Sequence, residues 1–229
     1  MTPNEPAAES SAASWREQAV ARSLDSARVR AENRVQRFID AAFELLIDSE
    51  PGKDFTVQDV VEKSGQSLRS FYQYFGGKQE LLLALFEESV RSTAEQLEER
   101  IKDERRPRER LHRFVLEYYA LCRPAPRGKG KKKASVALAE FAQQLMTAHP
   151  DEATRAFAPL VSLFDEVLSD AVASGDVRAD LGRGQIAGVV LEVIMFNAFS
   201  TTIGASAHGS GSGDPAEQLW ELLLHGIGS

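Results

Sequence analysis

The sequence predicts an all-α protein with an N-terminal three-helix domain, a larger helical domain behind it and about nine helices in all. Apolar residues recur at intervals of three and four in successive segments, the spacing that gives a helix one apolar face. Helix-breaking residues such as Pro51, Gly52 and Pro107 separate these segments. A length of 229 residues suits one large domain or a small domain fused to a medium one, and we place the two domains at 28–77 and 78–229.

The chain opens with residues 1–27, which carry Pro, Ser, Ala and Glu without an apolar stripe and are expected to form a mobile arm. Arginines accumulate toward its inner end, at positions 16, 22, 28, 30, 34 and 37. From about 28 to 49, residues such as Val35, Phe38 and Ala42 repeat at three and four, which predicts an amphipathic first helix.

Two short helices around a tight turn follow. Thr56 has Asp59 three residues on, the arrangement that caps a helix start, and this second helix is expected to end at Ser64. Gly65 stands where a left-handed residue is needed, and Ser67 can cap the next helix. This spacing is that of a helix-turn-helix motif.

The third helix has two different faces. Its expected inner stripe consists of Leu68, Phe71 and Phe75. Its other face carries Arg69, Ser70, Tyr72, Gln73 and Tyr74, all able to hydrogen-bond with bases or phosphates. In a helix-turn-helix this helix lies in the major groove, where Arg favours guanine and Gln favours adenine. The alternative is a surface helix whose polar side is only solvated.

The pattern Ser67-x-x-Ser70-Phe71-Tyr72-x-Tyr74-Phe75-x-x-Lys78-x-x-Leu81 resembles the signature of the TetR (tetracycline-repressor-like) transcriptional regulators over residues 34 to 82. The resemblance implies a homodimer that reads a palindromic operator and a C-terminal domain that binds a small effector. Leu68-Arg69 replace a common Pro or Gly and Tyr74 replaces a common His, so operator preference does not carry over.

We expect base specificity from Arg69, Ser70, Tyr72 and Gln73, and phosphate contacts from Thr56, Tyr74 and Lys78. The predicted DNA-binding set also includes Gln58, Gln66 and Leu68. A net charge of −7 argues against bulk attraction to DNA, so any contact must be local. The arginines of the N-terminal arm either reach phosphates and a minor groove or are simply solvated.

The larger domain begins with a helix from Lys78 to about 103, which connects both domains, so that a tilt of this rod would move the helix-turn-helix. Pro107 is expected to start a helix that runs to Cys122. Residues 124–134 form a basic loop, either solvated or attractive to a phosphorylated ligand such as an acyl-coenzyme A. Four more helices are predicted at about 135–147, 151–174, 184–204 and 214–225.

The helix at 184–204 has almost no polar face, and such a helix must be buried on every side. A second copy of the chain can supply the missing cover, so we predict a homodimer in which two helices from each chain form a four-helix bundle. The predicted interface residues are Ile186, Val190, Val193, Ile194, Trp220 and Leu223. The alternative is a monomer that covers these helices itself.

Aromatic and apolar residues from several of these helices are candidates for an effector pocket. The predicted set is Phe114, Tyr118, Tyr119, Phe141, Gln144, Leu145, Phe157, Phe164 and Asn197, and further candidates are Met146, Phe199 and the possible polar anchors Glu140 and Glu192. Each of the apolar members can equally be plain core. The effector itself is expected to be an apolar or amphipathic small molecule, with an acyl-coenzyme A as one possibility.

The placement of cysteine and histidine excludes several kinds of site. A single Cys122 precludes an internal disulfide, and His112, His149, His208 and His225 lack the spacing of zinc ligands. Without a nucleophile-and-base pair or a glycine-rich phosphate loop, we expect no enzyme activity and no cofactor. No leader segment and no apolar run of ~18–20 residues occurs, so we expect a cytoplasmic protein without a membrane partner. A helical small-molecule carrier and a ligand-blind DNA-binding protein remain as alternatives.

Overall fold

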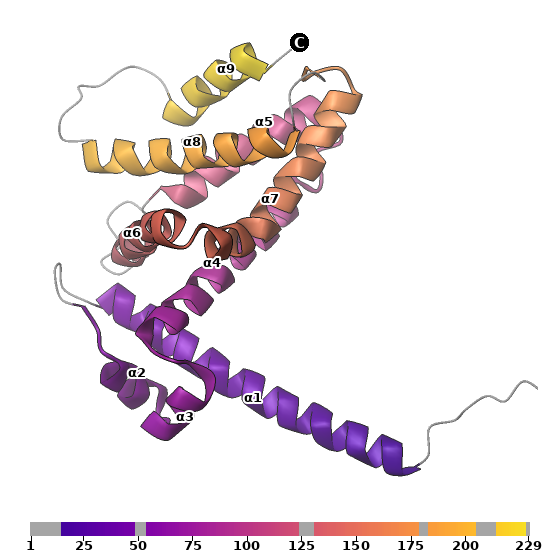
Figure 1. Ribbon diagram of the computed structural model, residues 1–229. Helices are drawn as coiled ribbons and strands as arrows, with labels where there is room; N and C mark the ends of the chain where they lie inside the picture. Colours follow the sequence, from indigo (N-terminus) through magenta and orange to yellow (C-terminus); the bar gives the residue numbers. More distant parts are fainter. Residues whose placement is uncertain (1–14, 49–53, 124–130, 179–182, 205–213, 228–229) are drawn as a thin grey trace, which may run out of the picture.

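The computed structural model describes residues 15–48, 54–123, 131–178, 183–204 and 214–227. Within these ranges the chain forms α-helices and no strand, which confirms the all-α prediction. The helices are α1 (Trp15–Asp48), α2 (Val57–Ser64), α3 (Leu68–Tyr74), α4 (Lys78–Ile101), α5 (Pro107–Cys122), α6 (Lys131–Ala148), α7 (Pro150–Ala173), α8 (Arg183–Gly204) and α9 (Pro215–Ile227). Helices α1–α3 lie at one end of the molecule, and α4 leads from them to the larger bundle (Figure 1).

Helix α1 is longer than the sequence pattern predicted. It begins at Trp15 instead of near residue 28, so the expectation of a mobile arm is wrong for residues 15–27, while residues 1–14 lie outside the described part of the chain. Residues 15–27 lack an apolar stripe but are rich in helix-forming residues. Extending an existing helix by one residue costs far less free energy than nucleating a new helix. In Figure 1 the N-terminal half of α1 projects past α2 and α3.

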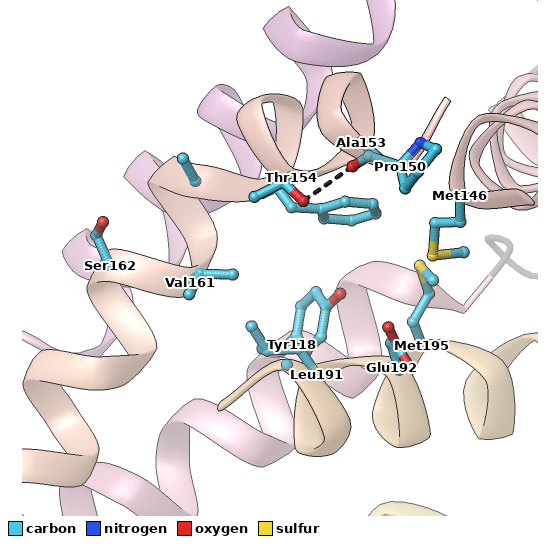
Figure 2. A pocket seen from close by; sticks show the side chains of 13 residues that line it. Tyr118, Met146, Pro150, Ala153, Thr154, Val161, Ser162, Leu191, Glu192 and Met195 are labelled. Carbon is cyan, nitrogen blue, oxygen red and sulfur yellow. Dashed lines mark hydrogen bonds between the residues drawn. The ribbon is translucent and has the colours of Figure 1, made fainter. Parts of the chain in front are cut away.

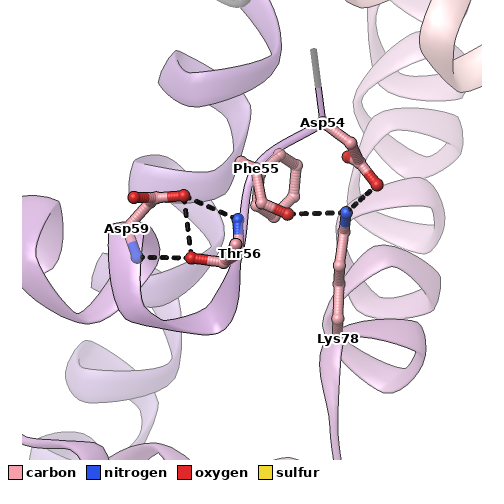
Figure 3. A network of polar contacts seen from close by, with 5 residues as sticks. All are labelled: Asp54, Phe55, Thr56, Asp59 and Lys78. Atoms are coloured by element: carbon pink, nitrogen blue, oxygen red, sulfur yellow. Dashed lines mark hydrogen bonds and ion pairs between the residues drawn. The ribbon is translucent and has the colours of Figure 1, made fainter. Parts of the chain in front are cut away.

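The caps around the helix-turn-helix are those that the sequence predicted. The Thr56 Oγ1 accepts a bond of 3.2 Å from the Asp59 backbone N–H, and the Thr56 N–H donates to the Asp59 carboxylate at 2.7 Å (Figure 3). Gly65 ends α2 with a left-handed φ of 65°. The Ser67 Oγ caps α3 by accepting from the Ser70 N–H at 3.1 Å.

The N-terminal domain has a core of aromatic rings. Phe71 of α3 meets Phe38 of α1 edge-on at a centroid distance of 5.4 Å, and Phe75 lies 5.4 Å from Phe71 and 6.1 Å from Phe38. All three rings are buried. They fix the position of α3 against α1.

Helix α4 contributes to both cores. Leu81 and Leu85, near its start, are buried in the N-terminal core, whereas Phe86 and Leu97 are buried in the core of the larger domain. Leu82 packs against both. The two domains therefore share one continuous helix, and a shift of α4 must be felt in both.

The larger domain is a bundle of α4 to α9. Arg110 clamps α5 to α7, with its Nη1 2.8 Å from an Asp170 oxygen and its Nη2 2.9 Å from a Glu166 oxygen. Helix α6 begins at Lys131, so the end of the predicted basic loop is helical, and its first part, residues 124–130, is outside the described ranges. None of the described helices combines the length and hydropathy of a membrane span.

We expect Gly65→Ala to lower the free energy of unfolding by about 1–2 kcal/mol, because a Cβ is unfavourable at left-handed φ. No neighbouring atom lies within 4 Å of the added Cβ, so the cost comes from the backbone alone. Urea unfolding with an unchanged m-value measures the change. Gly65→Asn should destabilise the protein less, because Asn tolerates this conformation, and equal effects of Ala and Asn would contradict the explanation.

Candidate functional site

Helix α3 presents one face to solvent. Arg69, Tyr72 and Gln73 are exposed there, and so is Leu68, which the sequence pattern wrongly placed in the inner stripe. Beside them is a polar hollow of about 350 Å³, lined by Arg34, Gln66, Ser67, Arg69, Ser70 and Gln73. The hollow joins α3 and its preceding turn to α1 through Arg34.

Several of the predicted DNA-contacting side chains are already bonded within the protein. The Gln66 Nε2 donates to the Arg34 carbonyl at 2.8 Å, and the Gln58 Nε2 donates to Glu62 at 3.0 Å. The Thr56 hydroxyl donates to the Asp59 carboxylate at 2.8 Å. These residues hold the motif in shape, and a contact with DNA would have to compete with those bonds.

Ser70 and Tyr74 are less accessible than Arg69, Tyr72 and Gln73. The Ser70 Oγ is enclosed and has no hydrogen-bond partner among the described residues, although Ser70 lines the hollow beside Arg69 and Gln73. A contact between this hydroxyl and a base would therefore require the hydroxyl to be uncovered. Tyr74 is half-buried against the core of the N-terminal domain. Helix spacing placed both residues on the outer side but could not reveal how closely the rest of the domain covers them.

Lys78, at the start of α4, was expected to hold a phosphate. Its Nζ instead forms an ion pair with Asp54 and donates to the Phe55 carbonyl at 2.7 Å, and it lies 4.3 Å from the centre of the Phe55 ring (Figure 3). The ammonium thus ties the start of α4 to the segment before α2. This segment lies far from Lys78 in the sequence, which is why spacing alone did not indicate the bond.

The larger domain contains a cavity of about 480 Å³ between α5, α6, α7 and α8. Its apolar wall includes Tyr118, Met146, Phe157, Val161, Leu191 and Met195, and its polar groups come from Thr154, Ser162 and Glu192 (Figure 2). Pockets for small molecules usually have volumes of about 300–1,000 Å³ and mostly apolar walls. The size and lining are therefore those of a ligand site.

Of the residues predicted for an effector pocket, Tyr118, Met146, Phe157 and Glu192 line this cavity, Glu140 does not, and the side chain of Phe199 lies outside the described part of the chain. The remaining aromatic and leucine side chains, Phe114, Tyr119, Phe141, Leu145 and Phe164, are buried in the core instead. Gln144 is exposed and Asn197 is half-buried, and neither lines the cavity. An apolar stripe shows which side of a helix turns inward, but not whether it meets another helix or a void.

The cavity wall holds few groups that can ionise at neutral pH. The Tyr118 hydroxyl hydrogen-bonds with the Cys122 thiol, and burial raises the pKa of Tyr118 well above its usual value and that of Cys122 to about 12. Both groups therefore keep their protons at neutral pH, and the thiol is a poor nucleophile. Among the described lining residues, Glu192 alone carries a charge. No cluster of metal-ligating side chains occurs in the described ranges.

Several large apolar side chains on α8 and α9 are exposed. Val189, Val193 and Phe196 of α8 are 60%, 39% and 42% exposed, and Leu222 of α9 is 69% exposed.

Most of the residues predicted for a dimer interface are covered by their own chain. Val190, Ile194 and Trp220 are buried in the core of their own chain, and Ile186 and Leu223 are half-buried against it. Of the predicted set, Val193 lies on the open face. A helix that is apolar all round does not reveal which face its own chain covers.

Residues 38–85 match the family described as "Bacterial regulatory proteins, tetR family". The fatty acid metabolism regulator protein of Bacillus subtilis (strain 168) is 22% identical over 165 residues, which are 70% of this chain and 81% of that protein. The structure of FadR from Bacillus subtilis in complex with stearoyl-CoA has a TM-score of 0.62 at 19% identity, covering 84% of this chain and 98% of that one. A TetR family transcription regulator from Marinobacter aquaeolei VT8 has a TM-score of 0.59 at 15% identity, covering 88% and 99%. The shared fold therefore extends over both domains.

Proposed function

The N-terminal domain of this chain belongs to the tetR family of bacterial regulatory proteins, and on that basis we propose that the chain is a homodimeric transcriptional repressor. It binds a palindromic operator and releases it when an apolar or amphipathic molecule enters the cavity of the larger domain. It acts in the cytoplasm, without a cofactor and without catalysing a reaction.

The exposed face of α3 is the observation that best supports sequence-specific DNA binding. Arg69 and Gln73 line a hollow at the surface and Tyr72 is exposed next to them, so these side chains can meet base edges in a major groove. Thr56 and Lys78 support this face by fixing α2 and α4, which makes them positioning residues more than phosphate ligands.

The exposed apolar face of α8 and α9 supports dimerisation. Val189, Val193 and Phe196, spaced four and three residues apart, form an exposed apolar face of α8, and Leu222 of α9 is exposed as well; a second copy can cover such apolar side chains through a two-fold axis. Such an axis also sets the distance and the relative orientation of the two α3 helices that would contact the operator. Two copies of α3 set roughly 34–36 Å apart enter successive major grooves of a palindromic site.

An aromatic contact and the shared helix α4 connect the cavity to the core that holds α3. Phe157 lines the cavity and meets Phe86 of α4 edge-on at 5.2 Å. Leu85, the residue before Phe86, belongs to the core that holds α3. A ligand that displaces Phe157 would therefore push on the helix shared by both domains and change the spacing of the two reading helices.

Long-chain acyl-coenzyme A is the first effector to test. The FadR structure of similar fold contains stearoyl-CoA, and the cavity here has an apolar wall that suits an acyl chain. Each of the two alternative functions retains either ligand binding or DNA binding, but not both. A small-molecule carrier would fill the cavity without binding DNA, and a ligand-blind DNA-binding protein would bind DNA and ignore every ligand.

Once in vitro selection has given the operator, Arg69→Ala should cost about 1–3 kcal/mol of binding at that site and relax preference at one base pair. Arg69→Lys keeps the charge but removes the planar fork, so it should retain phosphate attraction without the base preference. Fluorescence anisotropy on the operator and on single-base variants, at one salt concentration, measures both. An equal decrease in affinity for every sequence would contradict the role of Arg69 in specificity.

We expect Val193→Asp to give a monomer, because it places a charge in the middle of the apolar face of α8. Light scattering should report twice the chain mass of 25.2 kDa for the wild type and a single chain mass for the variant. Val20→Asp is the matched control, since Val20 is an exposed valine on α1. A wild-type monomer, or a dimer that tolerates Val193→Asp, would remove this interface from the proposal.

Gly188→Leu is expected to leave operator binding intact and abolish release by stearoyl-CoA. Gly188 lines the cavity and nothing lies within 4 Å of an added Cβ, so the larger side chain of leucine is expected to extend into the cavity and occupy part of it. Helix propensity also favours the change, so the variant should fold. Gly188→Ala controls for the backbone effect and should still respond. A full response from Gly188→Leu would show that the effector binds elsewhere, and a wild type that ignores stearoyl-CoA would exclude this effector.

A further inference from the structure

Between Arg16 and Arg37, helix α1 separates its charges between two sides. With each residue turning the helix by about 100°, Arg16, Arg30, Arg34 and Arg37 fall within roughly 60° of one another around the axis. The acidic residues Glu17, Asp25 and Glu32 fall on the opposite side. We call the side with the four arginines the basic face of α1. All four arginines are exposed, although the chain as a whole is acidic.

The basic face is continuous with the reading surface of α3. Arg34 lines the same hollow as Arg69 and Gln73, so the basic face points to the side on which α3 is presented. The bond from the Gln66 amide to the Arg34 carbonyl, at 2.8 Å, fixes this register between α1 and the turn before α3.

From Arg34 the basic face runs N-terminally to Arg16, about 27 Å along the helix axis at 1.5 Å per residue. Because α1 projects past α2 and α3, no other described part of the N-terminal domain covers the arginines of this stretch, which are exposed (Figure 1). A length of about 27 Å approaches one turn of duplex, roughly 34 Å, so the face can extend beyond the groove that holds α3.

We propose that the basic face of α1 is a second DNA contact surface, which binds phosphates of the duplex that flanks the site of α3. The inference rests on the proposed function as a DNA-binding protein. The occupant is duplex DNA because the face carries positive charge without an apolar stripe and joins a surface built to meet bases. Its contacts add affinity without adding sequence preference.

The same helix supplies a matched control. Arg22 and Arg28 lie on other sides of α1 and have partners within the helix. The Arg28 Nε is 2.7 Å from a Glu32 oxygen, and the Arg22 Nε donates to the Gln18 carbonyl at 3.2 Å. The double variant Arg16→Gln/Arg30→Gln removes two charges from the basic face, whereas Arg22→Gln/Arg28→Gln removes two charges from elsewhere on the helix.

The test measures operator affinity against salt by fluorescence anisotropy, for the full chain and both double variants, on duplexes with long and with trimmed flanks. With long flanks, the slope of log K against log salt should become shallower in Arg16→Gln/Arg30→Gln, by about 0.9 for each phosphate that this variant no longer neutralises. The control pair should keep the wild-type slope. With trimmed flanks the three proteins should bind alike. Circular dichroism checks that each variant keeps its helix content.

Equal slopes for the two double variants on long flanks, with operator preference intact, would overturn the basic face as a DNA surface and leave the proposed function standing. That result would assign the face to an acidic protein partner or to solvent. Sequence-tolerant binding by the wild type, with the slope difference preserved, would overturn the operator-specific function and leave the basic face. Absence of DNA binding by the wild type would overturn both.

Discussion

The reading surface depends on the packing of the Phe38, Phe71 and Phe75 rings. Helix α3 has seven residues, and an isolated helix shorter than about 12–15 residues is marginal in water. The Phe71 ring, fully buried and 5.4 Å from Phe38, therefore holds α3 in place through tertiary contact. Because α3 has no freedom to turn about its own axis, Arg69 and Gln73 stay on one side of the domain. The orientation of the Arg69 and Gln73 side chains relative to α1 is therefore set by the contact between Phe71 and Phe38 and not by the polar side chains themselves.

Helix α4 transmits that constraint to the rest of the molecule. Its first turns are part of the core around Phe71, and from Phe86 onward it belongs to the core of the larger domain. The cavity lies one side chain away, since Phe157 separates it from Phe86 at a centroid distance of 5.2 Å. Lys78 fixes the start of the same helix to the Phe55 carbonyl. A helix that is packed into two cores moves as a unit, and this is the physical basis on which a ligand can influence a distant helix.

The larger domain divides its apolar residues among a core, a cavity wall and an open face. Helix α8 takes part in all three, with Ile194 in the core, Met195 on the cavity wall and Val193 exposed. These residues are consecutive, and their different surroundings follow from the 100° turn between them. An effector and a partner chain would therefore act on different sides of one helix. In the proposed dimer, that arrangement would place ligand binding close to the contact between the two chains.

The sequence by itself determined the features that arise from short-range contacts. Thr56, Gly65 and Ser67 define the caps of α2 and α3 because cap chemistry lies within a few residues, and the family resemblance carried by Ser67 to Leu81 is confirmed by the match over residues 38–85. The apolar spacing likewise indicated the helical class. Tertiary structure alone decided which apolar side chains meet a void, as Met195 does and Phe114 does not, and which face of α8 stays open. Tertiary structure also decided that Arg34 lies beside the exposed face of α3 and that Lys78 hydrogen-bonds with the Phe55 carbonyl. Those outcomes depend on how segments that are distant in the sequence pack together, and such packing cannot be inferred from the spacing of neighbouring residues.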